Sequence, residues 1–565
     1  MTEWFLKNQP VEAEGIEIRG KKIPKVIIQI LKSRGYDTPE KIERYFDPSL
    51  SDLHDPFLLG SMEKAVDRVI KAVNNNEKVL VHGDYDADGI TGSALVIENL
   101  RKFGLDVDSY IPHRIVEGYG LSSNGIRQAI EKGCTLMITV DCGITAVQEV
   151  LQAKKSNVDV IICDHHKPQA ILPDAYAILD PKLPGDNYPF EELAGVGVAF
   201  KLIQGLYTTM KQPVETAYED LDLVALGSVV DVVPLIDENR VFVKYGLKRI
   251  TKSKKIGMQA ILKETGLKDD LTSYHLGFII GPRINACGRM RDAKEALELF
   301  LTNDQTKATK FAQNLSADNQ ERRLIEDTIY QEAKFIIQEN QLDKDRIIVV
   351  GKENWHEGVV GIVASKISEE FYKPAIILSV KQDIAKGSAR SIPDLDITET
   401  LSVCQDQLIR YGGHNQAAGL ELSIEKLVQL RQCINDYALK FDEAIFQRKH
   451  SYDMQISLDE ITEGVAYFLK FFEPTGMANP QPVFLGTNLE VVGVPRVVGN
   501  DHLKFALRDQ GKSFEAIAYY QANKILEIEP GKTRLDCLFS IAEDSYTRKK
   551  KTVLKIKEMK KSTQK

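Results

Sequence analysis

Residues 79–90 of the 565-residue chain read Val-Leu-Val-His-Gly-Asp-Tyr-Asp-Ala-Asp-Gly-Ile. The first three residues are typical of a buried strand, and the glycine and alternating carboxylates that come after them are typical of its end. Asp84, Asp86 and Asp88 cannot all be core residues, because like charges at this density repel unless a positive charge lies among them. The stretch therefore indicates a buried strand that ends either in a solvated acidic turn or in a metal site.

Four further apolar runs follow this strand, at residues 107–111, 136–140, 158–163 and 175–179. Helical patterns separate most of them, and this alternation is typical of βαβ units. We therefore expect an α/β domain with a mostly parallel sheet that is covered by helices on both faces. Sheets of this kind place their functional sites at the carboxyl ends of the strands.

Two more of the predicted strands end in residues that can bind metal. The run at 136–140 leads into Asp141, and the run at 158–163 leads into Asp164-His165-His166. Asp231 interrupts an apolar segment, where a carboxylate is unfavourable unless it is paired or bound. Asp231 could instead cap a helix or form a buried ion pair, and the histidines could be an ordinary polar strand end. The agreement of several motifs favours one shared site.

The residue types in these motifs indicate which metal the site takes. Aspartate and histidine without cysteine pairs favour Mn²⁺ or Mg²⁺ over structural zinc. A site with this many carboxylates suits two ions, which together bind the attacking and leaving oxygens of a phosphoester. The sequence therefore predicts a two-metal phosphoesterase.

The order of these motifs resembles the DHH phosphoesterase superfamily, and the string from His82 to Gly89 resembles its RecJ branch of single-strand-specific 5′ to 3′ exonucleases. Gly281-Pro-Arg-Ile-Asn-Ala-Cys-Gly-Arg289 is similar to a RecJ segment, with Cys287 where alanine is more usual. Tyr411-Gly-Gly-His-Asn-Gln-Ala-Ala-Gly419 is similar to the glycine-rich signature of the DHHA1 domain. The resemblance extends over almost the whole chain.

The resemblance implies a role for each metal-binding residue. One ion would be held by His82, Asp86 and Asp141, and the other by Asp88, Asp141, His165 and Asp231. Asp141 would bridge the two ions, and His166 would stabilise the scissile phosphate. Asp84 lies beside these ligands, and we expect it to support them rather than to bind metal directly.

The substrate side of the site is expected in the second half of the chain. The resemblance implies that Ser388 and Arg390, together with Arg283 and Arg114, contact the 5′ end of the substrate or nearby phosphates. Gly412, Gly413 and His414 can bring backbone N–H groups and an imidazole close to a phosphate. Surface ion pairs for Arg114 and Arg283, and a tight turn for the glycines, are the alternatives.

The remaining segments predict further domains. Residues 304–341 lack glycine and proline and predict one or two long polar helices of the kind that joins two domains. A second α/β pattern and then a small β-barrel come next. We expect an N-terminal extension at 1–65, packed on the residues after it, and a DHH domain at 66–300. A connecting helix at 301–342, a smaller DHHA1 domain at 343–450 and an OB-fold barrel at 451–565 complete the expected order.

The charge is distributed unevenly along the chain. The formal net charge is -8, yet residues 485–565 contain 16 Lys and Arg against 10 Asp and Glu. Aromatic residues stand at positions 505, 514, 519, 520, 539 and 546 of this cationic segment. A cationic barrel with aromatic side chains is suited to single-strand binding, although several of these aromatics must belong to the barrel core. The lysine-rich segment from Arg548 onward is either part of that surface or a solubilising tail.

The seven cysteines include no Cys-x-x-Cys pair, which argues against a disulfide scaffold or a zinc ribbon and favours a reducing cytoplasm. The first residues lack the apolar core of a signal peptide, and no segment is long and apolar enough to span a membrane. We therefore expect a cytoplasmic protein without a membrane partner.

These observations predict an exonuclease that degrades single-stranded DNA from the 5′ end to 5′-mononucleotides, in DNA repair and recombination. We expect a monomer that contacts a single-strand-binding protein and a RecQ-type helicase. One alternative is a DHH phosphodiesterase for short oligonucleotides or cyclic dinucleotides, which would not need the cationic barrel. Another is an inactive DNA-binding scaffold, which should have lost some of the metal ligands.

Overall fold

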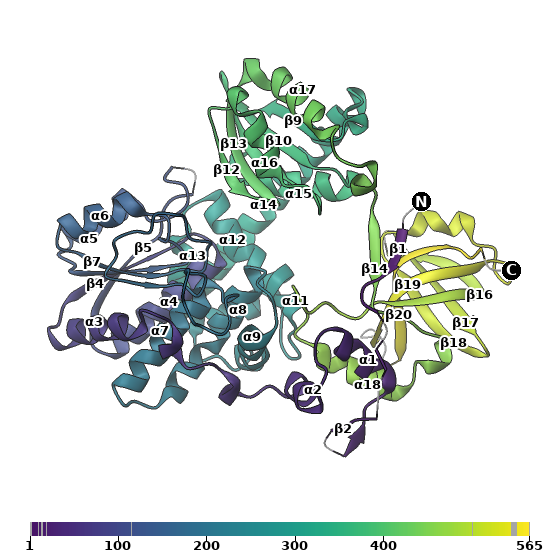
Figure 1. Cartoon of the computed structure of the whole chain (residues 1–565), viewed down its shortest axis with the longest axis horizontal. Coiled ribbons are helices and arrows are strands. Elements are labelled where there is room, and N and C mark those ends of the chain that lie inside the picture. The colour runs from purple at the N-terminus through teal and green to yellow at the C-terminus, as the bar shows by residue number, and fades with distance from the viewer. Residues whose placement is uncertain are drawn as a thin grey trace. The chain divides into compact units, whose positions relative to one another are not determined.

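The computed structural model describes residues 3–9, 11–12, 15–18, 20–114, 116–499, 501–543 and 551–563. These residues form two compact units. The larger unit consists of residues 54–233 and 237–448, and the smaller unit of residues 1–53, 234–236 and 449–565. Figure 1 labels their helices and strands.

A five-stranded parallel sheet forms the first part of the larger unit, in the order β5-β4-β6-β7-β8. Its strands are β4 (Lys78–Gly83), β5 (Asp106–Tyr110), β6 (Leu136–Val140), β7 (Asp159–Cys163) and β8 (Ala177–Leu179). The first and last residues of each strand lie within two residues of the corresponding ends of a predicted apolar run. The expected parallel α/β sheet is therefore confirmed.

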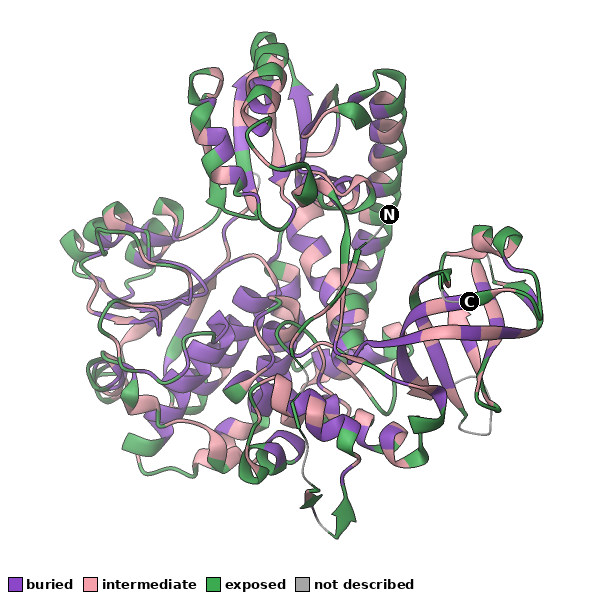
Figure 2. Cartoon of the chain, turned by 45° about the vertical axis from the view of Figure 1, so that its right-hand side comes forward, coloured by how far each residue is buried: buried purple, intermediate pink, exposed green. Residues whose placement is uncertain are grey.

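Helices cover both faces of this sheet (Figure 1). The helices are α3 (Met62–Asn74), α4 (Ala87–Lys102), α5 (Ser123–Glu131), α6 (Val147–Lys155), α7 (Gly195–Thr209) and α8 (Leu221–Val230). Helices α5 and α6 share an apolar core with one face of the strands, and α4 and α7 contact the strands as well. Strands buried on both faces need apolar residues throughout, which explains the continuous apolar runs. The buried residues of this region are purple in Figure 2.

A helical region follows the sheet and leads to the second half of the unit. It contains α9 (Asp237–Ile250), α10 (Ile256–Thr265), α11 (Ser273–His275), a π-helical turn (Leu276–Ile280), α12 (Gly281–Met290) and α13 (Lys294–Leu301). The predicted long helix is one helix, α14 (Gln305–Glu339), which begins where the Asp304 carboxylate accepts hydrogen bonds from two backbone N–H groups. It packs against α10, α12 and α13, and also against α15 (Glu357–Phe371), so it joins both halves of the unit.

The second sheet of the larger unit has five strands in the order β12-β13-β11-β10-β9. They are β9 (Ile348–Glu353), β10 (Ala375–Lys381), β11 (Ile384–Arg390), β12 (Arg410–His414) and β13 (Ala417–Ser423), with helices α16 (Ile397–Val403) and α17 (Leu427–Ala438). Only β9 and β10 are parallel. A disulfide joins Cys404 to Cys433, whereas the sequence argued against disulfides as a scaffold. The other five cysteines are free and buried.

The smaller unit contains a closed β-barrel, as predicted. Its strands run in the order β15-β16-β17-β18-β20-β19, and a pairing of β16 with β19 closes the barrel. They are β15 (Met454–Gln455), β16 (Phe484–Val498), β17 (His502–Asp509), β18 (Lys512–Ala518), β19 (Arg534–Glu543) and β20 (Thr552–Lys561). Strand β20 lies in the segment for which a solubilising tail was one alternative, and that alternative is wrong for residues 552–561. Tyr546 and Arg548 lie outside the described residues.

Of the expected N-terminal extension, residues 1–53 pack on the barrel, whereas residues 54–65 belong to the larger unit and pack on the residues that come after them. Helices α1 (Lys25–Ser33), α2 (Pro39–Phe46) and α18 (Glu463–Leu469) share one apolar core with the barrel strands. Ile27 of α1 and Phe539 of β19 both belong to this core. Arg34, at the end of α1, forms an ion pair of 2.8 Å with Asp453. A parallel pair of β1 (Glu3–Leu6) and β14 (Lys449–Tyr452) adds to the same association.

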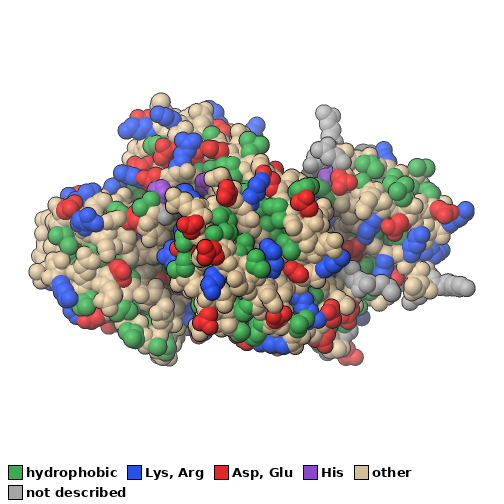
Figure 3. Space-filling model, turned by 90° about the horizontal axis from the view of Figure 1, so that it is seen from above, with side chains coloured by type: hydrophobic (Ala, Val, Ile, Leu, Met, Phe, Trp, Pro, Cys, Tyr) green, Lys and Arg blue, Asp and Glu red, His purple; other side chains and the backbone are tan. Residues whose placement is uncertain are grey.

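Charged side chains of both signs are interspersed on the face of the molecule in Figure 3, and no large area of that face carries a single sign. In the part of the chain that the structure describes, no helix has the length and apolar character needed to cross a membrane.

Candidate metal centre and phosphate site

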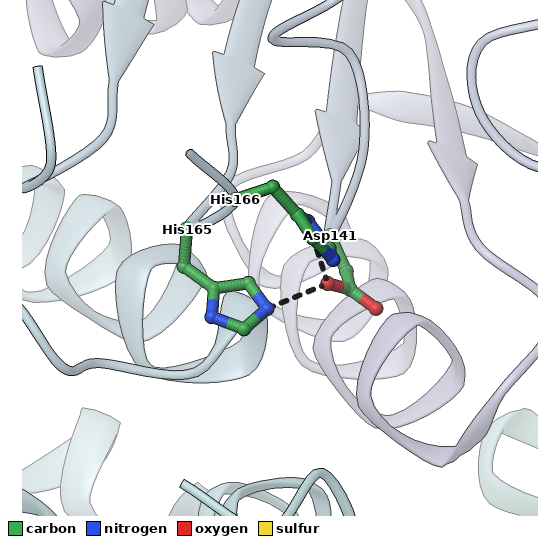
Figure 4. A group of neighbouring side chains, drawn as sticks. All are labelled: Asp141, His165 and His166. Carbon is green, nitrogen blue, oxygen red and sulfur yellow. Dashed lines mark ion pairs between the residues drawn. The ribbon is translucent and has the colours of Figure 1, made fainter. Parts of the chain in front are cut away.

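The predicted metal-binding side chains converge at the carboxyl ends of β4, β6 and β7. Asp84 and Asp86 follow β4, Asp141 follows β6, and His165 and His166 follow β7. Because these three strands are parallel neighbours, their ends meet at one edge of the sheet. Asp231 reaches the same place from the end of α8. Figure 4 shows both histidines directed toward one oxygen of Asp141.

His165 lies at the centre of this arrangement. Its Nε2 atom is 3.1 Å from Asp141 Oδ1, 3.5 Å from Asp231 Oδ2 and 3.8 Å from Asp88 Oδ2. Three sets of side chains offer ligand atoms within 4.8 Å of one another: Asp88, His165 and Asp231; Asp141, His165 and His166; and Asp84, Asp86 and Asp141. Asp141 belongs to two of the sets, as a ligand that bridges two ions would.

The set around Asp86 differs from the one that the resemblance implies. It contains Asp84, whereas the resemblance implies His82. His82 is fully buried, and its Nε2 atom accepts a hydrogen bond of 3.4 Å from the Ser122 N–H. Burial lowers the pKa of His82 to about 4, so the imidazole is neutral at pH 7. Within the described part of the chain, His82 belongs to none of the three sets.

The electrostatics of the carboxylates fit a bound cation. Burial, together with the repulsion of neighbouring carboxylates, raises the pKa of Asp84, Asp141 and Asp231 well above its ordinary value. The same two causes raise the pKa of Asp88 to about 7. Buried oxygens of Asp84 and Asp141 lack a hydrogen bond among the described residues, and so do both ring nitrogens of His165. Divalent cations would satisfy these atoms and remove the repulsion.

Backbone contacts hold the carboxylates in place. Asp88 accepts hydrogen bonds from the N–H groups of Gly195 (2.6 Å) and Val196 (2.8 Å) at the start of α7. A Cβ atom on Gly195 would lie only 2.6 Å from the Cβ of Asp141, so glycine is required there. Asp141 itself has a φ of +60°, a left-handed conformation that non-glycine residues seldom adopt. The ligands are therefore positioned by a tightly packed backbone.

His166 is held by a carboxylate that does not belong to the metal-competent sets. Asp164 Oδ1 lies 2.8 Å from His166 Nδ1, and Asp164 Oδ2 accepts a hydrogen bond from the Ile144 N–H. Burial alone would lower the pKa of His166, but the hydrogen bond to Asp164 raises it above the ordinary value. The His166 side chain is one-third exposed, so its imidazole lies where it can meet an anion.

Tyr119 is a neighbour of the site that the sequence reasoning missed. Its hydroxyl donates a hydrogen bond of 3.1 Å to the Asp141 carbonyl and lies 2.9 Å from His166 Nδ1. Gly118 and Gly120 on either side both have positive φ angles. The sequence analysis named Arg114 of the same loop, and the tyrosine between two glycines is the signal that could have added Tyr119.

Three arginines gather near the metal-competent residues, and we call them the arginine cluster: Arg114, Arg289 and Arg390. Burial and the neighbouring charge of Arg114 lower the pKa of Arg289 to about 9, and they lower that of Arg390. The Arg114 guanidinium lies 4.8 Å from the centre of the Tyr85 ring. Like charges gathered in partly buried positions are unfavourable unless an anion joins them. The cluster is therefore suited to bind a phosphate.

Ser388 lies on β11, two residues before Arg390, and both side chains face Gly361 of α15. A Cβ atom on Gly361 would lie 3.0 Å from Ser388 Oγ and 3.3 Å from Arg390 Nη2. Arg289 donates a hydrogen bond of 3.1 Å to the Gly358 carbonyl and thereby ties α12 to α15. Ser388, Arg390 and Arg114, which the sequence analysis named, are thus joined by Arg289, which it did not name.

The other expected substrate residues lie on α12 and on β12, where Gly412 is in register with Gly419 and, through it, with Ser388 of β11. Arg283 donates hydrogen bonds to Ser316 Oγ (3.1 Å) and to the Ile279 carbonyl (2.5 Å). Gly412, Gly413 and His414 form the exposed edge strand β12 rather than a tight turn. A Cβ atom on Gly413 would lie 2.2 Å from the Ala417 carbonyl oxygen, so this strand pairing needs glycine.

Comparison with known proteins shows which family the chain is similar to. The chain matches the model of the DHH family, N-terminal domain, over residues 78–228, the DHHA1 domain over 344–440 and the RecJ OB domain over 452–558. It is 37% identical to the single-stranded-DNA-specific exonuclease RecJ of Bacillus subtilis, over 95% of this chain and 68% of the relative. It is 36% identical to RecJ of Dickeya dadantii, over 86% and 88%.

A solved structure shows the same fold. The crystal structure of RecJ from Thermus thermophilus in complex with Mn²⁺ matches with a TM-score of 0.82 at 28% identity, over 95% of this chain and 76% of that one. The DHH, DHHA1 and RecJ OB models match in this order along the chain, on the parallel-sheet domain, the second α/β domain and the closed barrel. The chain belongs to the RecJ family.

Proposed function

We propose that this protein is a metal-dependent exonuclease that degrades single-stranded DNA in the 5′ to 3′ direction and releases 5′-mononucleotides. The observation that carries the proposal is the convergence of three metal-competent sets at one edge of the sheet, next to the arginine cluster. The two RecJ relatives, which are exonucleases specific for single-stranded DNA, support the substrate class.

The donor set supports two divalent ions, Mn²⁺ or Mg²⁺. One ion would be held by Asp88, Asp141, His165 and Asp231, and the other by Asp86 and Asp141 with Asp84 or His82. When bound, such ions lower the pKa of an attacking water and neutralise charge on the phosphate. Asp84 is favoured over His82 by its distance from the other two carboxylates.

The protein's own side chains orient the substrate. His166, held by Asp164 and next to Tyr119, would donate a hydrogen bond to the scissile phosphate. The arginine cluster and Ser388 would hold the 5′-terminal phosphate, which sets the direction of degradation. We assign this role to Arg289 in preference to Arg283, because Arg289 lies within the electrostatic reach of Arg114 and Arg390, whereas Arg283 is hydrogen-bonded to Ser316 and to the Ile279 carbonyl. Gly412, Gly413 and His414 would contact the phosphate backbone of the DNA strand.

The barrel would supply a separate binding surface for the single strand. Phe505 and Phe539 are buried in its core, and Phe514 packs against that core. Among the described aromatic residues of the segment 485–565, Tyr520 is 78% exposed and Tyr519 is 39% exposed, so these two side chains can stack on bases. The rival function, a phosphodiesterase for short oligonucleotides or cyclic dinucleotides, has no use for such a surface.

The remaining assignments depend on this function. We propose a domain division with residues 1–65 preceding a DHH domain at 66–300, a connecting helix at 301–342, a DHHA1 domain at 343–450 and an OB-fold at 451–565. We also propose a cytoplasmic monomer that acts in DNA repair and recombination with a single-strand-binding protein and a RecQ-type helicase. Retention of all the metal-competent residues argues against an inactive scaffold.

A single assay tests the proposal. Single-stranded DNA labelled at the 5′ or the 3′ end is incubated with the protein and Mn²⁺ or Mg²⁺, beside duplex DNA and RNA. We expect labelled mononucleotide to be released first from the 5′-labelled strand. Asp141→Ala should abolish this activity without loss of folding, because it removes a carboxylate that is unfavourable without metal. Near-normal activity of this variant with Mn²⁺ would contradict the assignment.

A further inference from the structure

A pocket lies in the larger unit, away from the metal-competent residues. It has a volume of about 350 Å³ and lies where α9 ends and the loop 251–255 leads into α10. Tyr245, Lys248 and Arg249 of α9, and Lys252 and Lys255 of the loop, line it. The segment 248–255 contains five cations and no carboxylate. A volume of this size is that of a small-molecule site.

Each of the two acidic side chains that line the pocket, Glu219 and Asp222, already has a partner. Asp222 Oδ1 lies 3.3 Å from Lys255 Nζ, and Asp222 Oδ2 accepts a hydrogen bond of 2.5 Å from Ser253. Glu219 pairs with Lys254 at 3.1 Å. Lys255 also pairs with the buried Asp220 at 2.6 Å. Both acids that line the pocket therefore already have a cationic partner, Lys254 for Glu219 and Lys255 for Asp222, although Lys255 is shared with the buried Asp220.

Three cations of the pocket are available to a ligand. Arg249 and Lys252 have no carboxylate within ion-pairing distance among the described residues, and Lys248 contacts only the ring of Tyr245, at 5.6 Å. In a protein with a net charge of -8, unneutralised cations around a concave surface point to an anionic ligand. The aromatic ring in the same pocket is suited to stack on a planar base.

The pocket is distinct from the metal centre. Asp222 lies in the first turn of α8, and Asp231 follows the last residue of the same helix. Nine residues of α-helix separate them by about 14 Å. Helix α4 runs between the same two places, with Asp88 in its first turn and Glu98, which pairs with Lys255 at 3.7 Å, near its end. A ligand in the pocket would therefore not occupy the cleavage site.

We propose that this pocket binds a nucleoside polyphosphate, whose phosphates contact Lys248, Arg249 and Lys252 and whose base packs on Tyr245. Three free cations match the charge of a diphosphate or triphosphate better than that of a monophosphate. A DNA strand would need a groove that continues along its backbone, whereas the lining of this pocket comes from two short segments, residues 219–222 and 245–255. The inference rests on the pocket alone and needs no exonuclease activity.

Calorimetric titration with ADP tests the proposal. The full-length protein is used with EDTA, so that metal-dependent binding at the other site is absent. We expect the wild-type protein to bind ADP. The double variant Arg249→Glu, Lys252→Glu should have an affinity for ADP that is lower by about tenfold or more. The matched control Lys307→Glu, Lys310→Glu changes two exposed lysines of α14 and should bind ADP like the wild type. Tyr245→Leu should weaken ADP binding but not pyrophosphate binding.

Three results would overturn the inference. If the wild-type protein does not bind ADP, the pocket is not a site for this ligand. Equal ADP affinity of the Arg249 and Lys252 variant, with only a lower melting temperature, would mean that the cations merely stabilise the carboxyl end of α9. Loss of single-stranded DNA binding in that variant, without ADP binding by the wild type, would make the pocket part of a strand-binding surface. Melting temperatures of all variants show whether each one is folded.

Discussion

Gly195→Ala is the substitution that most directly tests how the metal centre is built. Gly195 is the first residue of α7, and its N–H group donates to Asp88. An added Cβ would lie 2.6 Å from the Asp141 Cβ and 3.0 Å from Asp141 Oδ1. Because carbon atoms normally approach to about 3.5 Å or more, Asp141 and the start of α7 must separate by about 1 Å. The methyl group therefore acts on two predicted ligands at once.

The expected effect on activity is large and the effect on stability is moderate. A displacement of about 1 Å at reacting groups can lower a rate by about 10²-fold. Overpacking at a buried position costs about 1–3 kcal/mol of unfolding free energy. We therefore expect Gly195→Ala to fold, to lose about 10²-fold in the rate of release of 5′-labelled nucleotide, and to need more Mn²⁺ for half-maximal activity.

Gly197→Ala is the matched control in the same helix. A Cβ atom on Gly197 would lie 3.5 Å from the Leu193 side chain, which is an ordinary contact. We expect this variant to have the activity and Mn²⁺ requirement of the wild type. Wild-type activity of Gly195→Ala, or an equal loss in both variants, would refute the claim that close packing of α7 positions Asp141. Thermal unfolding of both proteins separates loss of activity from loss of folding.

Three further substitutions test other parts of the structure. Arg289→Ala should remove the preference for a 5′-phosphate over a 5′-hydroxyl end, whereas Arg283→Ala should keep it; competition between the two kinds of end measures this. Tyr520→Ala should weaken binding of single-stranded DNA by about 1–3 kcal/mol in a fluorescence titration, and an unchanged affinity would exclude stacking. Burial raises the pKa of Glu98 from 4.5 to about 7, so its contribution to stability is complete below pH 4.5 and is lost as the pH rises through 7. Glu98→Gln should therefore raise the melting temperature relative to the wild type more at pH 8 than at pH 5.

The sequence predicted those features that depend on local pattern. Parallel strands buried on both faces are continuous apolar runs, and each run here ends in the residues that its strand places at the edge of the sheet. The convergence of Asp141, His165 and Asp231 could therefore be expected before any coordinates were known. Strand β20 was harder to identify, because its alternation of lysine with apolar residues follows a run of lysines that is typical of a tail.

Features that depend on tertiary contacts could not be predicted. Arg283 and Arg289 belong to one motif, and their separation of six residues places them roughly 120° apart on α12. Only one of them can face the arginine cluster, and nothing in the motif says which. The sequence likewise does not say whether Asp84 or His82 is the metal ligand, because both lie at the end of β4.

The shared core of residues 1–53 and the barrel has a consequence for the synthesis of this protein. Roughly 400 residues separate α1 from the strands that bury it, and translation of that length takes about 20–80 s at 5–20 residues per second. During this interval Ile27 and its neighbours on α1 have no barrel to cover them. The nascent helix is thus a natural binding site for a chaperone. A ribosome that stalls before the barrel is made leaves an apolar helix exposed at the front of the chain, where quality control can recognise it.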